Sequence, residues 1–150
     1  MTKKFLYKDK NVKIFIDSNV LRNFCTGQQA DKECLFFLFE KRKRNTLFTS
    51  TLSIGQTLSH YKKSELQKAV EMGKFFNEKI TFVDFTENDV MQSFSESGKD
   101  LEDNMQYVCS QKGKNKCGII ISNDKTGFAD FANIIVVKPN KLGALRQLIG

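Results

Sequence analysis

Short runs of Ile, Val and Phe alternate along this chain with segments in which apolar residues recur every three or four positions. The short runs predict buried parallel strands at 12–16, 47–49, 80–83, 118–122 and 134–137. The longer periodic segments predict helices at 31–44, 53–62, 64–78, 86–95 and 100–112, and Pro139 opens a last helix. This order predicts an α/β fold of three α/β/α layers around a central, mostly parallel five-stranded sheet.

No internal repeat, low-complexity tract or linker interrupts the pattern, and the single proline lies near the end. The 150 residues are therefore expected to form one domain over 1–150. No apolar run is long enough to cross a bilayer, and no signal-length apolar stretch follows the basic first ten residues. These features predict a cytoplasmic protein without a membrane partner.

Charge and cysteine content narrow the classes of partner and cofactor. The chain has 24 Lys and Arg against 17 Asp and Glu, a net charge of +7. That excess favours a polyanionic partner such as nucleic acid, although a soluble basic surface explains it equally well. The four cysteines form no CxxC pair and there is one histidine, so a zinc site is not expected.

Three acids carry the candidate chemistry. Asp17 and Asp124 follow predicted strands, and Asp103 begins a predicted helix. Parallel strands end at one edge of the sheet, where α/β proteins bind ligands. Two carboxylates about 4 Å apart repel by about 4 kcal/mol at an effective dielectric of about 20. A Mg²⁺ or Mn²⁺ ion would remove that repulsion and act as a Lewis acid, so these acids predict a cation site.

Each acid also has a purely structural explanation. Asp17 fits a helix N-cap or Asx turn, and Asp124 fits a turn. Asp100 fits an N-cap with Asp103 in the first helical turn, where the helix dipole favours acids. Asp103 lies away from the apolar face of its helix, so periodicity alone predicts that it is solvated.

Two groups of basic residues are candidates for binding RNA phosphates. Both groups are explained equally well by solvation or by the dipole at a helix C-terminus. The residues are Lys41, Arg42, Lys43, Arg44, Lys112 and Lys114.

Four segments, taken in order, resemble the PIN domain, the metal-dependent ribonuclease fold of VapC-type toxins. The segments are IFIDSNVLRNF, TSTLSIGQTLSHY, KDLEDNMQYVCSQKGKNKCGIIISND and VVKPNKL. The resemblance spans almost the whole chain, and its most specific stretch is KDLEDNMQYV. It implies hydrolysis of RNA with Mg²⁺ or Mn²⁺. It also implies a cognate antitoxin as partner and leaves a homodimer open.

Residue by residue, the resemblance implies that Asp17, Asp103 and Asp124 are catalytic and bind the metal. Asp100 matches a further acid of a subgroup. Asn19 and Ser122 would orient ligands or substrate without binding the metal.

The chain departs from the family at two positions. Gln56 stands where the second acid, usually Glu, is expected, and Gly127 stands where many relatives have an acid. Gln56 can orient a water or a carboxylate but adds no charge. Metal affinity is then weaker, or Asp100 supplies the charge, or activity is lost and the domain binds RNA or protein without catalysis.

Overall fold

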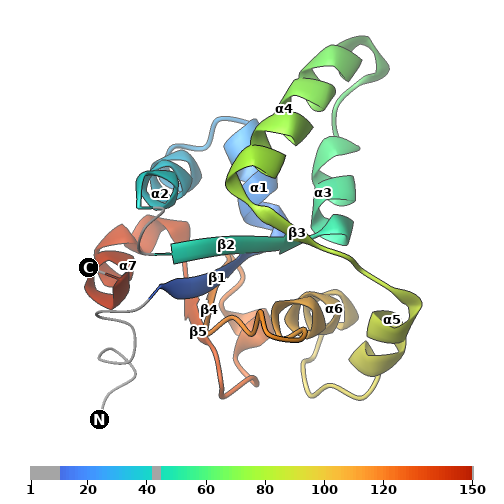
Figure 1. Ribbon diagram of the computed structural model, residues 1–150, viewed down its shortest axis with the longest axis vertical. Helices are drawn as coiled ribbons and strands as arrows, with labels where there is room; N and C mark the ends of the chain where they lie inside the picture. Colours follow the sequence, from blue (N-terminus) through green and yellow to red (C-terminus); the bar gives the residue numbers. More distant parts are fainter. Residues whose placement is uncertain (1–10, 42–44, 150) are drawn as a thin grey trace.

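Five short strands and seven α-helices follow one another in residues 11–41 and 45–149, the part of the chain that the computed structural model describes (Figure 1). The strands are β1 Val12–Ile16, β2 Asn45–Ser50, β3 Thr81–Val83, β4 Ile119–Ile121 and β5 Ile135–Val137. The helices are α1 Ser18–Cys25, α2 Gln29–Glu40, α3 Thr51–Leu58, α4 Leu66–Lys79, α5 Glu87–Ser93, α6 Leu101–Ser110 and α7 Leu142–Ile149. None of the described helices is long and apolar enough to cross a membrane.

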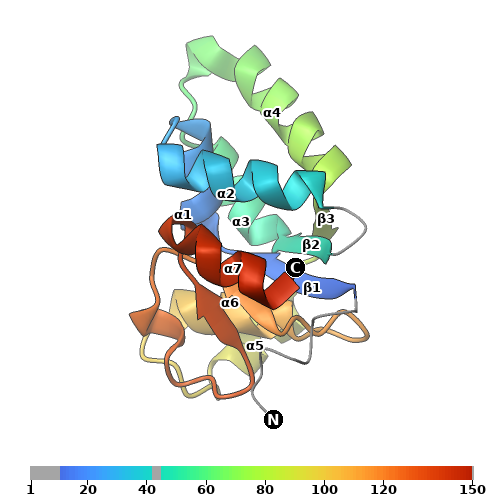
Figure 2. The same ribbon diagram turned by 90° about the vertical axis from the view of Figure 1, so that its left-hand side faces the viewer.

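The strands form one sheet in the order β3-β2-β1-β4-β5, and every pairing is parallel. All the strands therefore end at the same edge, here called the carboxyl edge. Helices cover both faces: α5 and α6 lie on one side of the sheet, and α1 to α4 and α7 lie on the other (Figures 1 and 2). The predicted α/β class, the three layers and the parallel five-stranded sheet are confirmed.

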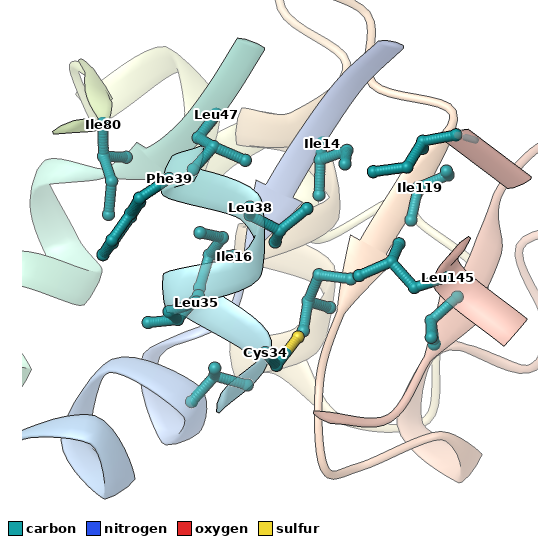
Figure 3. Packing of buried hydrophobic residues seen from close by; sticks show 14 of the residues in the cluster. Ile14, Ile16, Cys34, Leu35, Leu38, Phe39, Leu47, Ile80, Ile119 and Leu145 are labelled. Carbon is teal, nitrogen blue, oxygen red and sulfur yellow. The ribbon is translucent and has the colours of Figure 1, made fainter. Parts of the chain in front are cut away.

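The sheet is buried on both faces because its two central paired segments, 14–16 of β1 and 119–121 of β4, are apolar at every position. Ile14 and Ile16 of β1 pack into the larger core with α1, α2 and α7, whereas Phe15 packs on the opposite face with α6. Figure 3 shows Leu35 and Leu38 of α2 lying over this part of the sheet. Continuous apolar runs of this kind are typical of parallel sheets covered on both sides.

The largest difference from the predicted elements is α1, which the pattern did not predict. Its sequence SNVLRNFC follows β1 after one residue and makes barely two turns, too few for a clear helical period. The other elements lie where predicted, with ends shifted by a few residues. The early start of α1 matters, because it makes Asp17 the residue between β1 and α1.

Candidate active site

Asp17 is held in one orientation at the carboxyl edge by four hydrogen bonds. Its backbone N–H donates to Ile121 O of β4 at 3.0 Å, and its Oδ1 accepts from the Ser18 N–H at 2.8 Å. Its Oδ2 accepts from Ser122 Oγ at 2.8 Å and from Asn19 Nδ2 at 3.1 Å. Asp17 is thus the N-cap of α1 as well as a candidate ligand, and Asn19 and Ser122 both donate hydrogen bonds to its carboxylate.

Asp124 lies next to Asp17 because β4 pairs with β1. The same Ser122 hydroxyl that donates to Asp17 accepts from the Asp124 N–H at 3.0 Å. The Asp124 Oδ1 accepts from the Gly127 N–H at 2.9 Å, and the rest of the side chain is exposed. The turn predicted for Asp124 is therefore present, and it leaves one carboxylate oxygen directed away from the backbone contact.

Asp103 is buried, with 8% of its surface exposed, although periodicity predicted that it is solvated. The prediction was wrong because the loop after β4 covers this side of α6. A Cβ atom on Gly127 would collide with Asp103 Oδ2 and would lie 2.6 Å from Asp124 Oδ2. The two carboxylates therefore converge on the same small volume beside Gly127.

Asp100 has the structural role that was offered as its alternative. It is the N-cap of α6, and its Oδ1 accepts from the Asp103 N–H at 3.2 Å. Within the described part of the chain, no hydrogen-bond donor reaches the Asp103 carboxylate itself. The buried Asp103 carboxylate thus lacks the hydrogen-bond donors that stabilise the charge of the Asp17 carboxylate.

Electrostatics show that the acids form one group. Burial, together with the smaller effects of the charges of Asp17, Asp124, Asp100 and Glu102, raises the pKa of Asp103 to about 7. Burial also raises the pKa of Asp17, against the opposing effect of its hydrogen bonds from Ser122 and Ser18. A cation among these carboxylates would favour their charged forms and would lower both pKa values.

The donor set suits a hard divalent cation. Over residues 11–41 and 45–149, no three His, Cys, Asp or Glu side chains are arranged as a ready-made metal site. Mg²⁺, however, keeps several waters and is usually bound by only one or two carboxylates together with substrate phosphates. Asp103 and Asp124, which converge beside Gly127, fit that requirement because both offer carboxylate oxygens.

Comparison with solved structures identifies the fold. A chain of VapBC2 from Rickettsia felis, solved bound to a DNA fragment from the VapBC2 promoter, aligns with a TM-score of 0.59 and 14% identity over 83% of this chain and 97% of that one. VapC20 of Mycobacterium tuberculosis, described as a sarcin-ricin loop cleaving toxin, aligns with a TM-score of 0.58 and 14% identity over 81% and 98%.

The chain has the fold of a VapC-type PIN domain. A comparison of the sequence with protein-family models finds no match, and a comparison with curated proteins finds none either. The alignment to solved structures covers most of this chain and nearly all of each neighbour. The predicted PIN-like architecture is therefore confirmed at the level of fold.

Gln56 lies on α3, and its Oε1 atom is shielded from solvent without a hydrogen-bond partner among the described residues. Gln106 lies one turn after Asp103 on α6, and its Nε2 atom is also shielded from solvent without a hydrogen-bond partner among the described residues. Gln106 Oε1 accepts from Ser50 Oγ at 2.9 Å, so its amide is anchored at one end only. No sequence pattern singles out Gln106, because a glutamine on a helix is ordinarily exposed.

The basic residues predicted to bind RNA lie away from the acids or are already paired. Lys41 follows α2 and Lys114 precedes β4, so both lie near the starts of strands, opposite the carboxyl edge. The Lys112 ammonium forms a 2.7 Å ion pair with the buried Asp89 and donates to the Asp84 carbonyl at 2.7 Å. The remaining candidates, Arg42, Lys43 and Arg44, lie outside the described residues.

Proposed function

We propose that this protein is a metal-dependent endoribonuclease that hydrolyses RNA phosphodiesters and acts as the toxin of a toxin–antitoxin pair. The observation that carries the proposal is the convergence of Asp103 and Asp124 beside Gly127, next to a rigidly held Asp17. The pKa of the buried Asp103 carboxylate is raised to about 7, and a bound cation would lower it and favour the ionised form at neutral pH. Perturbed carboxylates that meet at a strand edge are typical of active sites.

Each residue has a distinct task in this proposal. Asp103 and Asp124 would hold Mg²⁺ or Mn²⁺, and Asp17 would contribute a carboxylate whose orientation Ser122 and Asn19 fix. The ion would lower the pKa of a bound water and stabilise negative charge on the phosphate. Asp100 keeps the first turn of α6 in place by capping it, so that it positions Asp103 rather than binding the ion.

An RNA substrate and an antitoxin partner are part of the proposal. Solved neighbours of the same fold include a complex of VapBC2 with promoter DNA and a toxin described as cleaving the sarcin-ricin loop. The net charge of +7 suits an RNA substrate. An antitoxin would then be encoded beside this chain, and the resemblance leaves open whether the toxin is a homodimer.

Gln56 supports one alternative, a PIN-like module that binds RNA or protein without cleaving. The amide places a neutral, unpartnered acceptor where the resemblance expects a charged acid. A site that is one charge short would bind divalent ions more weakly. The alternative therefore predicts RNA binding that persists without any metal-dependent cleavage.

Cleavage of a structured RNA by purified protein tests the proposal. We expect cleavage that requires Mn²⁺ or Mg²⁺, stops with EDTA, and is lost in Asp17→Asn and Asp103→Asn while both variants stay folded by circular dichroism. RNA binding without cleavage by the wild type would favour the non-catalytic alternative. Equal cleavage by the wild type and both variants would point to a contaminating nuclease and would contradict the assignment.

A further inference from the structure

A cavity of about 440 Å³ opens beside the acids, between the edge strand β5 and helix α7. Three lysines border it, Lys125, Lys138 and Lys141, and no acidic residue lines it. Apolar side chains of β5 and α7, including Val136 and Leu148, provide the rest of the wall. We call this feature the lysine cavity.

Residues that line the lysine cavity neighbour those of the candidate active site in sequence and in the sheet. Lys125 directly follows Asp124, and Lys138 directly follows Val137, the last residue of β5. The Val137 carbonyl accepts from the N–H of Ser122, the residue that also hydrogen-bonds Asp17. Lys138 is thus one strand from the end of β4, and neighbouring strands lie about 4.8 Å apart.

The three lysines carry charge that the described part of the chain does not neutralise. The ion pairs of the described residues are Lys68 with Glu65 and Lys112 with Asp89, and neither involves the lysine cavity. Lys125 and Lys141 are exposed, and Lys138 is partly exposed. This group of positive charges is complementary to an anionic ligand.

We propose that the lysine cavity binds the single-stranded RNA that flanks the cleaved phosphodiester, with its phosphates on Lys125, Lys138 and Lys141. The inference rests on the proposed ribonuclease function and extends it to a defined binding surface. Proteins that hold single strands without sequence preference bind the backbone phosphates in a positively charged groove. The three lysines supply that charge, and the aliphatic side chains of β5 and α7 form the wall between them. A peptide added to the free edge of β5 is the competing occupant, but it has no need of three lysines.

The test uses RNA affinity in a background that cannot cleave, Asp103→Asn, with a short fluorescein-labelled single-stranded RNA. The triple variant Lys125→Gln, Lys138→Gln, Lys141→Gln should raise Kd by about tenfold at 0.1 M salt. The slope of log K against log salt should fall by about 2, because each lost phosphate contact removes about 0.7. A purely structural role for the lysines would leave that slope unchanged.

A matched control removes the same charge elsewhere. Lys63→Gln, Lys68→Gln, Lys74→Gln changes three exposed lysines at and before α4 and should leave both Kd and the slope nearly unchanged. A second variant, Ala144→Glu, places a carboxylate on the exposed wall of the cavity and should also weaken binding. In the cleaving protein, the cavity triple variant should raise KM and leave kcat at saturating RNA unchanged.

The outcomes separate this inference from the function on which it rests. Wild-type cleavage together with equal Kd and slope in the cavity and control variants would overturn the cavity assignment while the ribonuclease stands. Wild type that neither binds nor cleaves RNA would overturn both. Loss of capture by the protein encoded next to this chain, with unchanged RNA affinity, would assign the cavity to that protein instead.

Discussion

The Asp103 carboxylate lies in the space that a side chain at Gly127 would occupy. The resemblance to PIN domains expects an acid at position 127, and here that position is left free for the carboxylates of α6 and of the β4 loop. The backbone of Gly127 does not require glycine, because its φ is not in the left-handed region. Glycine is therefore required at this position by the space that the two carboxylates occupy.

Replacing Gly127 with alanine should displace Asp103 and Asp124. We expect Gly127→Ala to lose most Mn²⁺-dependent cleavage and to lower the free energy of unfolding by about 1–3 kcal/mol, as is usual for overpacking. The matched control is Gly143→Ala in α7, where an added Cβ would contact nothing within 4 Å. That change should raise stability by about 0.5–1 kcal/mol, because alanine is the better helix former. Normal cleavage by Gly127→Ala would show that the two carboxylates need not remain where they are.

The raised pKa of Asp103 predicts the pH dependence of stability without metal. In the folded protein its pKa is about 7, against 3.8 for an unperturbed Asp. Between these values the native state binds the extra proton, so the contribution of Asp103 to stability falls as the pH rises from about 4 to about 7. Asp103→Asn should remove this fall, and should be more stable than the wild type by at least about 1 kcal/mol at pH 8 in EDTA.

Urea unfolding of both proteins at pH 5 and pH 8 measures this difference. Saturating Mn²⁺ should stabilise the wild type at pH 8 but should have little effect on Asp103→Asn, because ligand binding to the native state alone adds stability. A wild type whose stability rises from pH 5 to pH 8 in EDTA as much as that of Asp103→Asn would contradict the assigned pKa.

A carboxylate at position 56 should improve metal binding. We expect Gln56→Glu to increase Mn²⁺ affinity by about tenfold or more if α3 contributes to the site, since an added charge near the ion contributes at least about 1.4 kcal/mol. The same variant should be less stable than the wild type without metal, because it adds a shielded carboxylate to a cluster of acids. Isothermal titration calorimetry measures the affinity, and unchanged affinity would exclude Gln56 from the site.

Lys112 should be a structural residue and not an RNA-binding residue. Its ammonium lowers the pKa of Asp89 through a direct hydrogen bond and ion pair, even though burial alone would raise that pKa. Lys112→Met should lower the free energy of unfolding by about 1–3 kcal/mol at neutral pH. The loss should shrink as the pH falls and Asp89 becomes protonated. RNA affinity and its salt slope should remain those of the wild type, and a lower slope would restore the original sequence-based assignment.

The sequence predicted the strands and most of the helices, because these depend on local hydrophobic pattern. It did not predict features that depend on contacts between segments far apart in the chain. Apolar runs of β-branched residues fixed the strands, and strands ending in Asp17 and Asp124 located the carboxyl edge. The burial of Asp103 was missed because helical periodicity considers α6 alone, whereas the loop around Gly127 covers it from another element. For the same reason local pattern could not group Lys125 with Lys138 and Lys141, because the pairing of β4 with β5 brings these two separate segments together.

The most direct test of the metal site is anomalous scattering from crystals soaked in Mn²⁺ with a non-cleavable RNA analogue. We expect a Mn²⁺ peak within coordination distance of the Asp103 and Asp124 carboxylates, beside Gly127. An RNA phosphate should lie adjacent to the Mn²⁺ ion. The peak should be absent in crystals of Asp103→Asn treated in the same way. A wild-type structure in which Mn²⁺ binds only at other carboxylates, with Asp103 left unbound, would contradict the proposal that Asp103 and Asp124 hold the metal.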